Sequence, residues 1–114
     1  MKLRSIAVLV AIVGLPALAI AAEMHMGTAD SEVGKAFMAA NDKMMKDMAI
    51  EPTGDADRDF VTMMIPHHQG AIEMARIELQ FGKDPQLRQL AEAVIVAQEK
   101  EIAEMKAWLA GHNP

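Results

Sequence analysis

The sequence predicts an all-α protein, built as a small antiparallel bundle of about three long helices. Apolar residues recur with a 3.6-residue period through three segments, and no stretch shows the alternation of a β-strand. Asp, Gly and Pro residues bound these segments as helix caps and stops. The chain has 114 residues, no Cys and no Tyr, which limits it to one domain and excludes disulfides, thiolate metal sites and a Cys nucleophile.

Residues 1–22 are predicted to be a signal peptide. Lys2 and Arg4 supply its positive start, an apolar run follows, and small residues permit cleavage after Ala21 or Ala22. The alternative, an uncleaved membrane anchor, is disfavoured because the run is short for a bilayer span of ~20 residues. We therefore expect export, with the periplasm as the destination.

Residues 23–30 are expected to form a flexible arm, and residues 31–114 a helical metal-binding domain. Removal of the signal leaves nine basic and sixteen acidic residues, together with ten of the eleven Met. A net-negative surface repels phosphate backbones, so nucleic acid is not an expected partner. Such a surface suits metal cations, and the excess of Met indicates soft ones.

The first helix is predicted to start from a cap at Asp30 or Ser31 and to run to about Ile50. After a turn, the second helix covers residues 57–81. Pro66 lies inside it and removes one backbone hydrogen bond, so we expect the helix to be kinked there; two helices meeting at Pro66 is the alternative.

The third helix is predicted to begin with Asp84 as its cap and Pro85 in its first turn, and to continue to about Ala110. Its apolar stripe is expected to be buried. The stripe consists of Leu87, Leu90, Ala91, Val94, Ile95, Ile102, Met105, Trp108 and Leu109.

His67 and His68 both fall in the apolar sector of the second helix, where Phe60 and Met74 mark its middle. Met63 and Met64 lie one turn before them, and thioethers with neutral imidazoles match Cu(I), with Ag(I) as a mimic. The alternative is structural, because a Met stripe is commonly core filler and a single inward His commonly a satisfied core residue.

Three further regions extend this ligand set. Met44, Met45 and Met48 share one face of the first helix at chelating spacing, and are expected to meet the imidazoles across the core. Glu101, with Gln98 beside it, interrupts the third helix's stripe; its carboxylate is expected to hydrogen-bond His67 or His68 and fix the tautomer, unless it is an edge residue reaching solvent. In the arm, Met24, His25 and Met26 form a second soft cluster.

The run from Asp59 to Ile72, which contains Met-Ile-Pro-His-His-Gln, resembles the signature of a bacterial family, domain of unknown function 305, with CopM-type periplasmic copper-binding members. The likeness continues through Gln98, Glu101, Met105 and Trp108. The resemblance implies a ferritin-like helical bundle that binds Cu(I) or Ag(I) through Met and His. Longer relatives carry two helical-hairpin units and this chain has one His-His motif, so we hypothesise a homodimer.

The predicted function is therefore non-enzymatic: a periplasmic protein of copper homeostasis that sequesters or carries Cu(I), with copper-exchange proteins as further partners. A Met-lined helical module that binds other proteins without metal is the main alternative. A ferritin-like metalloenzyme is disfavoured because a di-iron site uses Glu-x-x-His motifs, and Met64 and Ile65 stand three residues before the two His.

Overall fold

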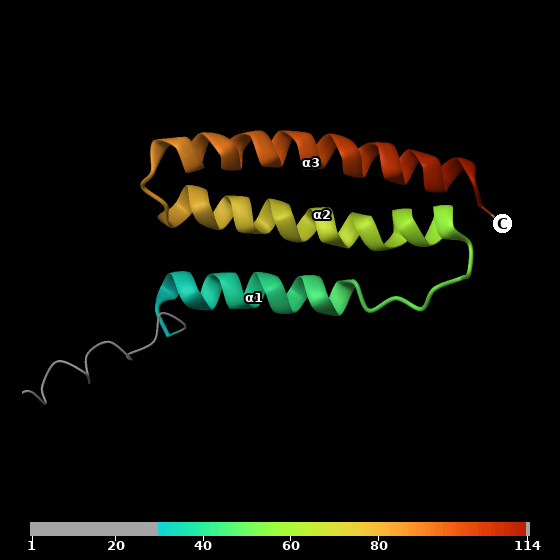
Figure 1. Ribbon diagram of the computed structural model, residues 1–114, viewed down its shortest axis with the longest axis horizontal. Helices are drawn as coiled ribbons and strands as arrows, with labels where there is room; N and C mark the ends of the chain where they lie inside the picture. Colours follow the sequence, from blue (N-terminus) through green and yellow to red (C-terminus); the bar gives the residue numbers. More distant parts are fainter. Residues whose placement is uncertain (1–29, 114) are drawn as a thin grey trace, which may run out of the picture.

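A computed structural model describes residues 30–113 and contains three helices there: α1 (Glu32–Asp47), α2 (Ala56–Phe81) and α3 (Pro85–Gly111). The helices run antiparallel to their neighbours, with α2 in the middle (Figure 1). The predicted all-α fold is confirmed. The fourth helix of a ferritin-like bundle is not supplied by the described residues. None of the described helices is both long and apolar enough to span a membrane.

The start of each helix is fixed by the residue before it. Ser31 accepts a hydrogen bond from Gly34 N at 3.0 Å, Asp55 caps α2, and Asp84 accepts from Gln86 N at 2.9 Å. These contacts satisfy backbone donors that have no partner within the helix. Of the two caps predicted for the first helix, Ser31 is the one observed, and the predicted cap at Asp84 is confirmed. The predicted end of the first helix at Ile50 is three residues too late, since Pro52 disfavours helical geometry just before it.

The segment between α1 and α2 is held by one carboxylate. Asp59 accepts hydrogen bonds from Thr53 N at 2.8 Å, Thr53 Oγ1 at 2.7 Å and Gly54 N at 3.0 Å. Gly54 has φ of +90°, a conformation that side-chain-bearing residues rarely adopt. The hydrogen bonds from Thr53, together with that from Gly54, hold the pKa of the Asp59 carboxyl below its ordinary value of 3.8.

Acid is therefore expected to release this segment. Because the folded pKa of Asp59 is lowered, its stabilising contribution is complete above the unfolded value near 3.8 and is lost as the pH falls through the lowered value. NMR of the Thr53 and Gly54 amides during acidification measures the release. In Asp59→Asn we expect weaker amide protection already at neutral pH, while Asp57→Asn, whose side chain accepts none of these bonds, should resemble the wild type. Equal protection in both variants would contradict this assignment.

Helix α2 is continuous through Pro66, so the alternative of two helices meeting there is wrong; the kink itself stays a prediction.

Contacts at both ends join α2 to α3. The Arg88 guanidinium donates to the carbonyls of Leu79 at 2.8 Å and Gly82 at 3.0 Å, and Arg58 donates to the carbonyl of His112 at 3.0 Å. The hairpin is thus tied at its turn and at its open end.

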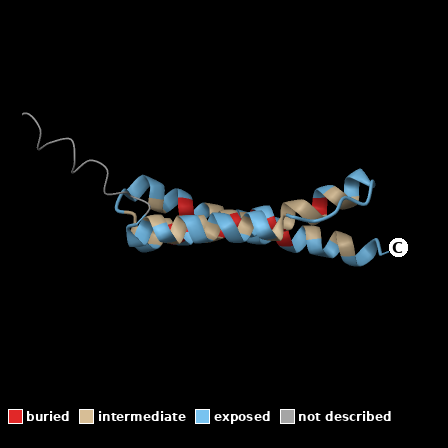
Figure 2. Cartoon of the chain, turned by 90° about the horizontal axis from the view of Figure 1, so that it is seen from below, coloured by how far each residue is buried: buried red, intermediate tan, exposed pale blue. Residues whose placement is uncertain are grey.

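The predicted small helical bundle is confirmed, and it is an open one of a single layer, since α1 contacts α2, α2 contacts α3, and α1 does not touch α3. Seen edge-on, they overlap along much of their length, and α2 and α3 separate toward the end that holds the C-terminus (Figure 2). Buried residues occur in α2 and α3, and α1 has none. The expectation that Leu87 and Leu90 are buried is wrong, because a single layer leaves its broad faces uncovered.

Candidate metal centre

The centre of the candidate site is a contact between His68 on α2 and Glu101 on α3. His68 Nε2 lies 2.5 Å from Glu101 Oε2. The imidazole is buried, with 8% of the side chain exposed, whereas the Glu101 side chain is 52% exposed. The expected contact between Glu101 and one of the two imidazoles is therefore present, and the imidazole is that of His68. Glu101 stands at the edge of the helix pair and still reaches inward.

The other ring nitrogen of His68 is buried and has no hydrogen-bond partner among the described residues. When Nε2 donates its proton to the carboxylate, Nδ1 keeps its lone pair. A buried lone pair without a donor is costly. A carboxylate that orients an imidazole whose other nitrogen is free is the usual arrangement behind a metal-ligating His. Gln98 Oε1, one turn before Glu101, is likewise buried without a partner.

His68 and Glu101 line a cavity of about 480 Å³ between α2 and α3. Two sulfur-bearing side chains line it as well, Met64 from α2 and Met105 from α3. The sequence predicts Met64 as a ligand but treats Met105 only as core. Met105 lies four residues after Glu101 and therefore on the same face of α3, and this spacing is the feature of the sequence from which its place could have been predicted. Phe60, Val61, Glu104 and Trp108 complete the lining.

The expectation that both imidazoles face the interior is wrong for His67. Its side chain is exposed, and the two ring centroids are 6.1 Å apart with planes tilted by 59°. Consecutive helical residues point about 100° apart, and α3 packs only on the side of His68. Met63, one turn before His67, is half-buried and is not part of the cavity around His68.

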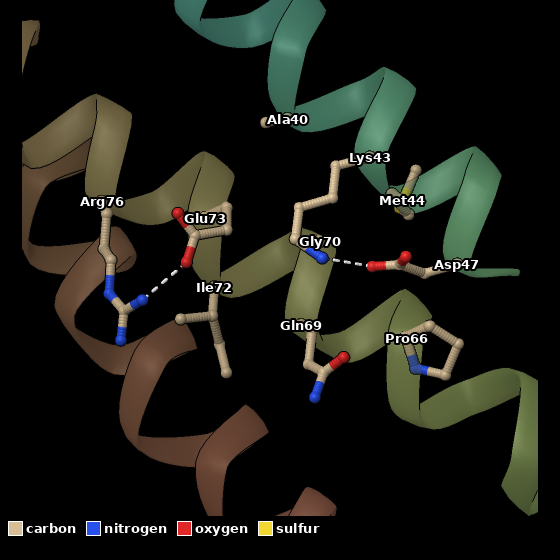
Figure 3. Close-up of a pocket in the computed structure, with 10 residues that line it drawn as sticks. All are labelled: Ala40, Lys43, Met44, Asp47, Pro66, Gln69, Gly70, Ile72, Glu73 and Arg76. Carbon is tan, nitrogen blue, oxygen red and sulfur yellow. Dashed lines mark hydrogen bonds and ion pairs between the residues drawn. The ribbon is translucent and has the colours of Figure 1, made fainter.

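The methionines of α1 do not line the cavity of His68. Met44 packs against Gly70 and lines a different cavity of about 350 Å³ between α1 and α2 (Figure 3). That cavity is polar, with Lys43 paired to Asp47 and Arg76 to Glu73. Met45 is 60% exposed and Met48 is half-buried. These sulfurs therefore do not meet His68, because α1 and α3 lie on opposite sides of α2; their meeting with His67 stays a prediction.

The side chains around His68 include soft thioether ligands as well as hard carboxylate ligands. Within residues 30–113, no three or more His, Cys, Asp or Glu side chains gather in a way that would hold a metal ion. A metal at His68 would therefore need the thioethers of Met64 and Met105 as partners of Nδ1. That set of one imidazole and two thioethers suits a soft ion and lacks the oxygen ligands that Mg²⁺ and Ca²⁺ require. Met24, His25 and Met26 lie outside the described residues.

Comparison with known proteins places the chain in a family. Over 53 residues, 46% of its length, it is 42% identical to an uncharacterized protein of Acanthamoeba polyphaga mimivirus, and the match spans 35% of the viral protein. The family model described as domain of unknown function (DUF305) matches residues 8–109, which include α1, α2 and almost all of α3. The chain therefore belongs to the DUF305 family.

Proposed function

We propose that this chain is a non-enzymatic Cu(I)-binding protein that sequesters or carries copper, as the CopM-type members of its family do. His68 Nδ1 is the proposed anchor, with the sulfurs of Met64 and Met105 beside it. The single observation that supports this most is that Nδ1 of His68 is buried without a partner, in a residue that lines the same cavity as both thioethers. Glu101 holds the opposite nitrogen, and so selects the tautomer that leaves Nδ1 free.

The chemistry of these groups favours a soft monovalent ion. Neutral imidazole and thioether ligands leave the charge of Cu(I) or Ag(I) unneutralised, and the carboxylates of Glu101 and Glu104 line the same cavity. Those negative charges lower the cost of holding a cation in a partly apolar place. Divalent ions that favour oxygen would find carboxylates only at the cavity's exposed side.

The proposal includes the cell envelope as the place of action. Residues 1–22 have the pattern of an export signal, and an exported copper carrier would exchange its ion with partner proteins in the periplasm. Met24, His25 and Met26 then form a second soft-metal cluster near the start of the mature chain. Copper held by such groups serves homeostasis and resistance, with no catalytic step assigned to the chain.

The deciding experiment is an anaerobic titration with Cu(I) and Ag(I) against a competing chelator. We expect the double variant His67→Ala/His68→Ala to lose most of the affinity of the helical domain, and His68→Ala alone to lose binding at the cavity between α2 and α3. Met64→Leu and Met105→Leu should each weaken binding while preserving volume. His112→Ala is the matched control, because that imidazole stacks on Trp108 at 4.2 Å between ring centroids and is exposed. Affinity that survives the double substitution would overturn the metal function.

A metal-free interaction module is the second candidate, and one observation favours it. Several large apolar side chains are exposed on the helices, among them Met38, Met45 and Phe60. Met-rich surfaces adapt to different partners. Full Cu(I) affinity in the His double variant, or no specific affinity in the wild type, would make this the better assignment.

A further inference from the structure

The two broad faces of the helix layer differ in chemistry. On α2, α1 packs near Pro66 and Gly70, and α3 packs near His68 and Ala75, which lie on roughly opposite sides of the helix at ~100° per residue. One face between these contacts is rich in apolar side chains and sulfur, and we call it the methionine face; the carboxylates of Glu78, Glu101 and Glu104 also lie on it, since they line its two cavities. Its residues are Met38, Met45 and Met48 of α1, Phe60, Met63, Met64, His67, Ala71 and Met74 of α2, and Leu87, Leu90, Val94, Met105 and Trp108 of α3.

The opposite face is polar. It carries the ion pairs of Arg76 with Glu73 and with Glu99, and the cavity lined by Lys43 and Asp47. On the methionine face lie the cavity of His68 and an apolar cavity of about 300 Å³. Both cavities are formed between α2 and α3. The second is lined by Ala71, Met74, Ala75, Glu78, Leu87, Leu90, Ala91 and Val94.

The methionine face exposes large apolar side chains along the α2–α3 pair. Phe60 is 60% exposed and Leu90 is 57% exposed, at opposite ends of the α2–α3 pair. Contiguous apolar patches beyond a few hundred Å² usually mark an interaction site. Since α2 has 26 residues, the methionine face is about 39 Å long, and it is more than two helices wide. Its area is therefore roughly 800–1,000 Å². A stable complex buries ~800 Å² on each partner, which is a similar area.

The shape of the face fits a second copy of the same chain. Phe60 projects at one end of α2, and the apolar cavity floored by Ala71, Ala75 and Ala91 lies toward the other end. Phe60 and Met74 are equally distant from His67, seven residues on each side. A two-fold axis crossing α2 at His67 therefore places each Phe60 over the small-residue cavity of the partner, so the protrusion and the hollow match reciprocally.

The same register gathers sulfur at the axis. Glu101 pairs with His68 and Met44 packs on Gly70, which fixes the levels of α3 and α1 along α2. One helical turn beyond these contacts, Met105 of α3 lies at the same height along α2 as Met64, and Met48 of α1 lies at the same height as Pro66. The methionines nearest the axis are thus Met45, Met48, Met63, Met64 and Met105 from each copy.

We propose that a second copy of this chain docks antiparallel on the methionine face, and that His67 of the two copies, with the surrounding thioethers, forms a shared site for Cu(I) or Ag(I). This explains why His67 is exposed in the single chain: its partner imidazole comes from the second copy. The shared site rests on the proposed function, whereas the docking does not. Because the net negative charge of each copy opposes association, as do the Glu101 carboxylates level with His68 near the axis, a bound cation there strengthens the dimer.

Sedimentation equilibrium of the purified chain, with and without Ag(I), tests the docking. We expect a dimer whose dissociation constant falls when Ag(I) is added. Met74→Glu buries a charge in the proposed interface and should weaken the dimer by on the order of 100-fold. Val96→Glu is the matched control, because Val96 is 70% exposed on the side of α3 away from the methionine face. Circular dichroism confirms that both variants remain helical.

A cysteine cross-link tests the register, since the chain contains no Cys of its own. His67→Cys should form an intermolecular disulfide rapidly because the axis brings position 67 of both copies together, and Val96→Cys should not. A monomer at all concentrations with and without Ag(I), equal masses for the two Glu variants, or equal cross-linking at both positions would overturn the docking. Dimerisation without Ag(I) binding would overturn the proposed function and leave the docking intact. Ag(I) binding by a chain that stays monomeric would overturn the docking and leave the proposed function intact.

Discussion

Replacing Glu101 by Ala is expected to lower the affinity of the chain for Cu(I) by roughly 10- to 100-fold, although Glu101 itself contributes no ligand atom to the proposed site. Its carboxylate lies 2.5 Å from Nε2 of His68 and keeps the proton on that nitrogen. Without this acceptor, the proton can occupy Nδ1, where it competes with the metal, and the ring loses its fixed orientation. Competitive chelator titration under anaerobic conditions measures the loss.

A positioning role for Glu101 differs from simple attraction of a cation. Glu104 lines the same cavity and carries the same charge, but it forms a long ion pair with Lys100, at 3.7 Å between Nζ and Oε1. Glu104→Ala is therefore the matched control and should cost much less affinity. Glu101→Gln keeps an oxygen that accepts from Nε2 and should recover part of the loss. Equal losses in the Glu101→Ala and Glu104→Ala variants would contradict the positioning role.

Replacing Gly70 by Ala is expected to displace α1 and to lower the free energy of unfolding by about 1–3 kcal/mol. A Cβ at this position would lie 2.5 Å from Met44 Sδ, 2.7 Å from Cγ and 3.0 Å from Cβ. The sulfur end can rotate away, but the Met44 Cβ moves only with its backbone, so the helix itself must shift. Since α1 contacts no described helix but α2, nothing else holds it in register.

Urea unfolding measures the stability change, and limited proteolysis of residues 48–55 measures how far α1 detaches. Gly111→Ala is the matched control, because no atom lies within 4 Å of its added Cβ. There the higher helix propensity of Ala should make the substitution neutral or slightly stabilising. Met44→Ala combined with Gly70→Ala should restore part of the register. Unchanged stability and cleavage in Gly70→Ala would show that the Met44 contact does not position α1.

The helices and their caps could be predicted because they depend on local chemistry. Ser31, Asp55 and Asp84 each satisfy amides two or three residues away, and such short-range contacts can be found in the sequence. The partner of His68 could also be predicted, since a carboxylate within an apolar stripe requires one. Met105 was expected in the core, and its place in the cavity depends on the pairing of α2 with α3.

The exposure of His67 and Phe60 could not be predicted from the periodicity of α2. A helical wheel gives the direction of each side chain but not the positions of the neighbouring helices. Here the neighbours pack on opposite sides of α2. As a result Phe60, expected near the centre of the apolar sector, is exposed, while Pro66 is buried on the side of α2 that faces α1. Pairing of helices is a long-range property that one sequence does not specify.

The position of Trp108 gives this protein a built-in optical probe. It is the single Trp in a chain without Tyr, and its indole lines the cavity of His68, stacked on His112 with an angle of 9° between the rings. Ultraviolet-excited emission from the unlabelled protein therefore comes from this one place. Quenching or a spectral shift as an ion enters can be followed in real time, so the kinetics of loading and release are accessible without attaching a dye.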